Sequence, residues 1–221
     1  MHPDTMRLID RWVGIPLCFF ASFWPLKKAQ ADSNSTLATN IPPPDTIVFI
    51  LIAEIGALVV AYPAIKETRK QHPKSRICFI TAPAGLQTLE LMGFEKEDIF
   101  LLETSSIKSL LKGIVNIRSH FKGRRVSAIV LEPFTRFSTL LSAWIGASKR
   151  IGCYRFLNEG VYLGNILTHR LVYNPHLHMS QTYFALAKAL IEPDSAKPLL
   201  KEYIPSQIKN RLKINIPEKE Q

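Results

Sequence analysis

The chain has 221 residues, which suits one large α/β domain with appendages. A hydrophobic fraction of 47% and an aromatic fraction of 10% exclude wholesale disorder. The net charge of +10 at pH 7 favours anionic partners, among them nucleic acid, lipid headgroups, nucleotide diphosphates and phosphorylated glycolipids.

Residues 1–30 are predicted to associate with a membrane. Positions 12–26 carry no charge and are rich in aromatic residues, with Arg11 before them and Lys27 and Lys28 after them. The run is shorter than the roughly 20 apolar residues that a spanning helix needs. Aromatic residues between basic flanks favour an interfacial anchor on the cytoplasmic leaflet. A secretion signal or short membrane span, and a helix packed on the protein, remain as alternatives.

Residues 31–45 are polar and proline-rich and predict a linker. Residues 46–195 then alternate between apolar β-branched runs and segments of helical spacing. Strict alternation predicts a Rossmann-like α/β domain, a parallel sheet with helices on both faces and right-handed crossovers. The expected strands are 46–53, 76–81, 98–102, 126–132 and 150–153, and the expected helices are 57–71, 85–92, 107–121, 136–145 and 179–191. Residues 154–175 are predicted to be loop-rich.

The turn after the first strand is the best-placed ligand site in this fold. In doubly wound sheets, ligands bind at the carboxyl ends of strands, beside helix N-termini. Residues 53–57 read Ala-Glu-Ile-Gly-Ala, which is neither a GxGxxG fingerprint nor a P-loop. Gly56 alone is weak support, because a tight turn also explains it.

Two longer segments add a family resemblance. Residues 54–81, EIGALVVAYPAIKETRKQHPKSRICFIT, resemble the opening motif of the heptosyltransferase-like glycosyltransferases of family 9. That motif is a strand, a Gly-Asp turn, a helix containing Pro-Ala, and a His-Pro before the second strand. Pro63-Ala64 and His72-Pro73 match it in place. Residues 150–190 also resemble this family, in a branch with a membrane-proximal N-terminus.

The resemblance implies a GT-B enzyme, in which two Rossmann-like domains face each other across a cleft. The N-terminal domain holds the acceptor, commonly the lipopolysaccharide inner core, and the C-terminal domain binds the nucleotide-sugar, typically ADP-heptose. Residues 46–195 would then be the acceptor-side domain. Residues 196–221 would be a linker toward a donor domain that this chain lacks, so that the chain alone is expected to be inactive.

The resemblance also implies partners and location. Such enzymes need no chelated metal, and no cofactor is expected here. The expected partners are an anionic glycolipid acceptor and a membrane surface, with no nucleic acid. Three widely spaced cysteines without a CxxC pair, Cys18, Cys78 and Cys153, favour reduced thiols and a cytoplasmic location, peripheral to the inner membrane.

One departure from the family pattern bears on the mechanism. The family's carboxylate, taken as the general base, follows the turn glycine, where this chain has Ala57. Glu54 is the nearest replacement, because an apolar cleft raises the pKa of a carboxyl toward neutrality. Its alternative role is to cap the next helix. A non-catalytic Rossmann-like binding module derived from such an enzyme remains the alternative for the whole chain.

Other candidates lie at later strand ends. Glu132 could hydrogen-bond acceptor hydroxyls, or be a strand-end carboxylate that faces water or an arginine. Arginines after the fifth strand suit the phosphates and carboxylates of a lipopolysaccharide core. Two histidines resemble a metal pair but lack a third nearby ligand, so a helix cap or an acceptor contact is favoured over zinc. The predicted acceptor-binding residues are Gly56, Ala57, Glu132, Arg150, Tyr154, Arg155, Glu159, His176 and His178.

Overall fold

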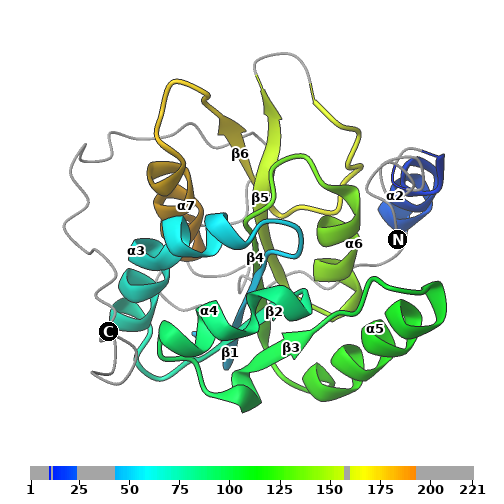
Figure 1. Cartoon of the computed structure of the whole chain (residues 1–221). Helices are drawn as coiled ribbons and strands as arrows, with labels where there is room; N and C mark the ends of the chain where they lie inside the picture. The colour runs from blue at the N-terminus through cyan, green and yellow to red at the C-terminus, as the bar shows by residue number, and fades with distance from the viewer. Residues whose placement is uncertain (1–9, 11, 24–42, 157–159, 193–221) are drawn as a thin grey trace.

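The computed structural model describes residue 10 and residues 12–23, 43–156 and 160–192. Six parallel strands form one sheet in the order β3-β2-β1-β4-β5-β6, with helices on both faces (Figure 1). The predicted parallel α/β fold is therefore confirmed. The strands are β1 (Thr46–Ile50), β2 (Arg76–Thr81), β3 (Ile99–Leu101), β4 (Val126–Val130), β5 (Lys149–Phe156) and β6 (His169–Tyr173).

One helix precedes β1, and helices follow every strand except β5, which β6 follows directly. They are α2 (Gly14–Phe23), α3 (Ile55–Gln71), α4 (Leu86–Leu91), α5 (Ile107–Phe121), α6 (Arg136–Trp144) and α7 (Met179–Lys188), with short 3-10 turns η1 (Pro83–Gly85), η2 (Lys96–Asp98) and η3 (Ala189–Ile191). The predicted linkers at 31–45 and 196–221 lie outside the described residues, except for 43–45.

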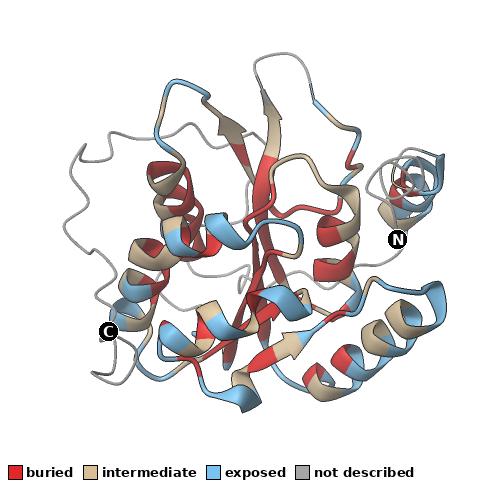
Figure 2. Ribbon diagram, in the orientation of Figure 1, coloured by how far each residue is buried: buried red, intermediate tan, exposed pale blue. Residues whose placement is uncertain are grey.

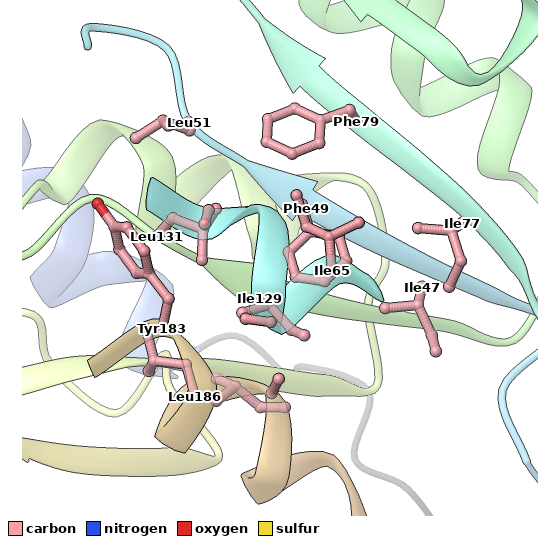
Figure 3. Packing of buried hydrophobic residues seen from close by; sticks show 14 of the residues in the cluster. Ile47, Phe49, Leu51, Ile65, Ile77, Phe79, Ile129, Leu131, Tyr183 and Leu186 are labelled. Carbon is pink, nitrogen blue, oxygen red and sulfur yellow. The ribbon is translucent and has the colours of Figure 1, made fainter. Parts of the chain in front are cut away.

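The two central strands are buried on both faces, which is why they read as continuous apolar runs. All five residues of β1 and all five of β4 are buried. On one face Phe49 stacks on Phe79 with ring centroids 5.9 Å apart, and Ile129 packs beneath α3 and α7 (Figure 3). On the other face Val48 and Ile50 pack with residues of α5 and α6. Buried residues accordingly run the length of the central strands (Figure 2).

Two predicted elements match their observed bounds, β2 and α5, and β6 was missed. β6 lies within the stretch expected to be loop-rich, residues 154–175. It is the edge strand and pairs with β5 alone, with a register shift between Cys153 and Arg155. Its sequence mixes His169 and Arg170 with apolar residues, so it lacks the continuous apolar run that marks the central strands.

The N-terminal helix α2 packs on the domain, beside α6 (Figure 1). Cys18 in its middle is fully buried. The Asp10 carboxylate makes an ion pair with Arg136, with Nη1 2.8 Å from Oδ2, and accepts the backbone N–H of Phe137 at 3.2 Å. The N-terminal segment therefore caps the first turn of α6 from outside that helix. No helix in the described segments is long and apolar enough to cross a bilayer.

Glu132 fixes the loop that leaves β1. Its Oε1 accepts the backbone N–H of Ile52 at 2.8 Å and that of Ala53 at 2.7 Å. Its Oε2 accepts the hydroxyl of Ser138, a fully buried residue in the first turn of α6. These bonds take Ile52 and Ala53 out of the sheet ladder. They explain why β1 ends at Ile50, earlier than the predicted residue 53.

Glu132→Ala is expected to lower the free energy of unfolding by about 2 kcal/mol, because the amides of Ile52 and Ala53 lose their acceptor in a partly buried loop. Glu132→Gln keeps a carbonyl oxygen for these amides and should cost less than about 1 kcal/mol. Urea unfolding and amide hydrogen exchange over residues 51–54 measure both effects. Glu103→Ala, at an exposed carboxylate after β3, is the control. Unchanged exchange at Ile52 in Glu132→Ala would contradict this role.

Candidate functional site at the strand-order reversal

The sheet order reverses between β1 and β4, and this reversal defines the candidate site. β1 is followed along the chain by β2 on one side, whereas β4 lies on its other side. In open α/β sheets, ligands bind beyond the carboxyl ends of strands at such a point. The residues that follow β1 and β4 include Glu54 and Glu132. The two carboxylates that the sequence singled out therefore follow neighbouring strands.

Glu54 is the exposed carboxylate of the pair. It occupies the N-cap position of α3 with extended backbone angles, φ −125° and ψ 102°, and its side chain makes no capping hydrogen bond. The Glu54 side chain therefore does not cap α3 through a hydrogen bond. Glu132, by contrast, is 8% exposed, and its oxygens accept two backbone amides and a hydroxyl. It faces neither water nor an arginine.

Gly56 and Ala57 belong to the first turn of α3. Gly56 is exposed, and a Cβ added there would meet no atom within 4 Å. The backbone at Gly56 therefore does not need glycine for space, and the surface above it is open to a ligand. Ala57 is half-buried and packs against the core under α3. Its methyl group can neither accept a proton nor donate a hydrogen bond.

Tyr183 of α7 is a residue that the sequence analysis missed. Its side chain is 1% exposed and its ring lies beside Leu131, with the hydroxyl turned away from Leu186 (Figure 3). Burial raises the pKa of the Tyr183 phenol well above its usual range, and the negative charges of Glu54 and Glu132 add to that rise. The phenol therefore stays neutral beside the two carboxylates. The sequence analysis predicted only a helix over residues 179–191.

An aromatic pair lies on the same edge of the sheet. Phe134, just after β4, has φ 61°, an uncommon left-handed conformation for a residue other than glycine. Its ring meets that of Tyr173 edge to face, with centroids 5.5 Å apart. Tyr173 is the last residue of β6. Backbone strain of this kind is often found at binding sites.

The ends of β5 and β6 carry the remaining candidates. Tyr154 and Arg155 are half-buried at the end of β5, and the Arg155 guanidinium lies 6.0 Å from the Tyr154 ring centroid. His178 caps α7, with Nδ1 accepting the backbone N–H of Ser180 at 3.2 Å. The predicted capping role of His178 is confirmed. His176 is exposed in the same loop, and Glu159 lies outside the described residues.

Arg150 is not at the candidate site, and its prediction as an acceptor contact is wrong on geometric grounds. It pairs with Ala128 in the middle of β4, below the carboxyl end of the sheet. Its side chain is 1% exposed, and its guanidinium donates to the carbonyl of Ile166, at 2.6 Å from Nε, and to that of Ala147. A buried guanidinium that donates to backbone carbonyls in this way is not accessible to a ligand.

The described residues hold no group of three His, Cys, Asp or Glu side chains that could bind a metal ion. The three cysteines are free and buried, as expected for core thiols. Burial raises the pKa of Cys18 to about 11 and that of Cys78 to about 12. Neither thiol therefore forms a nucleophilic thiolate at neutral pH.

Comparisons with known proteins identify the fold. No family model matches the chain, and no curated protein matches its sequence. Two structures of E. coli heptosyltransferase WaaC, one with ADP-2-deoxy-2-fluoro heptose and one with ADP, match with TM-scores of 0.53 at 10% and 8% identity. Each match covers 69% of this chain, and they cover 50% and 49% of the two WaaC chains. A family 9 glycosyl transferase from Veillonella parvula matches with a TM-score of 0.56 at 17% identity, over 80% of this chain and 46% of that one.

This chain therefore spans about half the length of the solved structures that it matches. At such low identities the likeness concerns the fold. The six-stranded all-parallel sheet with its helices matches half of a GT-B glycosyltransferase, and the resemblance to the heptosyltransferases of family 9 is confirmed at that level.

Proposed function

We propose that this chain is the acceptor-binding half of a heptosyltransferase-like glycosyltransferase that acts on a lipopolysaccharide-type acceptor. One observation carries the proposal. The Glu54 carboxylate is exposed at the strand-order reversal, makes no capping hydrogen bond to α3, and lies two residues before Gly56, where the surface is open. It lies on a sheet whose fold matches family 9 structures. An acceptor hydroxyl that attacks a sugar requires a base to take its proton and an open surface on which the acceptor can bind. Both features lie at the end of β1.

In the proposed reaction, Glu54 accepts the proton of the acceptor hydroxyl as its oxygen attacks the anomeric carbon of the donor sugar. The bond between that carbon and the diphosphate oxygen breaks, and the diphosphate leaves with the electron pair. Configuration at the anomeric carbon inverts. Tyr183 is kept neutral by burial, and its phenol interacts electrostatically with the Glu54 carboxylate. Glu132 acts as a positioning residue, because it holds the loop that carries Glu54.

Acceptor recognition is assigned to the strand ends around Glu54. Arg155 supplies a guanidinium suited to phosphate or carboxylate groups. Tyr154 and the Phe134–Tyr173 pair supply rings at the same edge of the sheet. The net charge of +10 favours an anionic acceptor over a neutral one.

The donor is proposed by analogy. WaaC was solved with ADP and with an ADP-heptose analogue, so ADP-heptose is the donor assigned here. The described residues form one Rossmann-like unit, whereas the matched structures are about twice as long, so the donor is assigned to a second domain. Because the acceptor is lipid-linked, the protein is proposed to work in the cytoplasm, at the surface of the inner membrane.

A second candidate function rests on Ala57. A half-buried alanine where the family places its base leaves a binding surface without that base. If Glu54 does not replace it, the chain is a non-catalytic Rossmann-like module that binds the same acceptor. The two candidates share acceptor binding and differ in proton transfer.

Acceptor binding is tested on the chain alone with lipopolysaccharide truncated to its inner core. Gly56→Leu places a side chain over the open surface and should weaken binding by about tenfold or more in calorimetry, because each 1.4 kcal/mol of lost contact is tenfold. The fold should be unaffected, because a Cβ there meets nothing. Leu91→Ala, on the exposed side of α4, is the control. Equal affinity of Gly56→Leu and the wild type for the acceptor would show that the surface above Gly56 does not contact the acceptor.

Proton transfer is tested with Glu54→Gln in the chain joined to a donor-binding half. Loss of a general base costs about 10²–10⁴ in turnover. The melting temperature should not fall, since the side chain makes no capping bond. Acceptor affinity should also persist, because glutamine keeps the shape and the hydrogen-bonding reach. Near-normal turnover in this variant would falsify the assignment of Glu54 as the base and favour the binding module.

Ala57→Asp restores the family's carboxylate beside Gly56. If the chain is a weakened member of the family, turnover in the joined protein should rise. A modest loss of stability, about 1 kcal/mol, is expected because the site is half-buried against the core. Ala57→Asn has the same shape without the base and is the matched control. Equal turnover in the two variants would mean that position 57 does not take part in proton transfer.

A further inference from the structure

Helix α2 has two opposed faces. Gly14, Cys18 and Ser22 are spaced four apart and face the domain. A helix turns 100° per residue, so Phe19, Phe20 and Phe23 lie roughly 100–160° around the helix from Cys18, and Trp12 comes two residues before the helix begins. Their side chains are exposed by 71%, 48%, 68% and 74%, for Trp12, Phe19, Phe20 and Phe23 respectively. The helix therefore presents an aromatic stripe to its surroundings.

This stripe is held in a fixed position on the domain. The hydroxyl of Ser22 accepts the backbone N–H of Asn165 at 3.0 Å and donates to the carbonyl of Cys18 at 2.7 Å. Gly164 has φ 57°, and a Cβ there would collide with the Ser22 hydroxyl and the Cys18 carbonyl. Four residues before α2 begins, the Asp10 carboxylate binds the first turn of α6. The helix is thus docked, and its aromatic stripe points in one direction relative to the sheet.

Helix α5 carries a second apolar stripe. Ile107, Leu111 and Val115 are spaced four apart and exposed by 59%, 57% and 57%. Lys108 and Lys112 are exposed next to them, and the helix contains no acidic residue. Apolar side chains flanked by lysines suit an interfacial helix, because lysine stems lie along the apolar phase while their ammonium groups reach the headgroups.

The two helices lie on the same side of the sheet, with α6 between them (Figure 1). α2 packs on α6, and the Arg118 guanidinium of α5 lies 4.7 Å from the ring centroid of Trp144, the last residue of α6. Arg118 also donates to the Trp144 carbonyl. Figure 2 colours many residues of both α2 and α5 as exposed. Trp144 itself is 46% exposed.

We propose that α2, Trp144 and α5 together form one surface that lies on an anionic lipid bilayer. Exposed apolar side chains gathered on neighbouring elements are typical of interaction surfaces, and those of α2, Trp144 and α5 are exposed by 46% or more. The charges identify it: exposed Lys108 and Lys112, with no acidic residue in α5, complement the anionic headgroups of a bilayer. This inference rests on the proposed action at a membrane. It assigns the membrane contact to α2, Trp144 and α5, and not to residues 1–30 alone.

The surface also relates the bilayer to the candidate site. α6 begins just after Glu132, at the carboxyl end of β4, and Asp10 caps that first turn. Asp10, four residues before α2, is therefore joined to the segment that follows β4, the neighbour of β1. A lipid-linked sugar held at the bilayer beside α2 would lie on the side of the domain where α6 begins.

The test is made with the full chain and brominated phospholipids, which quench tryptophan fluorescence on contact. Trp12→Phe with Trp24→Phe leaves Trp144 as the one remaining tryptophan of the three in the chain. Vesicles of phosphatidylglycerol and phosphatidylethanolamine should quench it. If the protein binds the vesicles but Trp144 is not quenched, the two-helix surface is wrong, and an anchor of residues 1–30 alone survives. If the protein does not bind vesicles, both the surface and the membrane part of the proposed function fail.

Point substitutions separate the two helices. Lys108→Gln with Lys112→Gln should lower partitioning on anionic vesicles by about tenfold or more, and leave partitioning on neutral vesicles nearly unchanged. Leu111→Asp should weaken binding to both kinds of vesicle, whereas Leu91→Asp, on α4 over the other face of the sheet, should not. Equal partitioning for Leu111→Asp and Leu91→Asp would overturn the role of α5. Deletion of residues 1–30 is less informative, because it also removes the Asp10 cap of α6.

A second copy of the chain is the alternative partner for this apolar surface. Light scattering on the full chain without lipid should show a monomer whose mass does not change in Leu111→Asp. A dimer that dissociates in this variant, with vesicle binding unaltered, would assign the surface to a second copy of the chain and overturn the bilayer. Binding of the truncated lipopolysaccharide to Gly56→Leu reports separately on the candidate site.

Discussion

The structure depends on the burial of β1 and β4 on both faces. Every residue of these two strands is buried, so each face of the sheet must be covered by helices. α3, α4 and α7 cover one face, and α5 and α6 cover the other. The polar side chains next to β1 and β4 that could meet a ligand therefore lie where these strands end. The carboxyl ends of β1 and β4 are adjacent, and their following loops bring two carboxylates to one edge.

Those two carboxylates differ because their partners differ. Glu132 is buried and accepts two amides of the loop after β1 and a hydroxyl of α6, so it organises the backbone. Glu54 is exposed at the start of α3 and makes no capping bond, so it remains available to a ligand. A buried acceptor that satisfies backbone donors stabilises a loop, whereas an exposed carboxylate is free to accept a proton from a bound ligand. The proposed division of roles follows from this contrast.

Helix α2 gives the domain a second exposed side, to which the proposed bilayer contact is assigned. Its small buried face and its exposed aromatic face make it a docked element, with contacts from Asp10 at one end and Ser22 at the other. In the proposal, α2 and α5 share the bilayer surface, and Asp10 before α2 contacts the start of α6. A transferase that works on a lipid-linked sugar needs such an arrangement, because its acceptor stays in the membrane while its reacting hydroxyl enters the protein.

The sequence by itself determined the α/β alternation, because period and apolar runs are local properties of a parallel sheet covered on both faces. It predicted β2 and α5 at their observed bounds, and it marked Glu54, Gly56 and Glu132 as residues at strand ends. Only the tertiary structure decided which side chains are exposed. Arg150 is buried by distant carbonyls, Tyr183 joins the site from α7, and edge strand β6 forms by pairing with β5. Those outcomes depend on contacts between segments far apart in the chain, which no local pattern encodes.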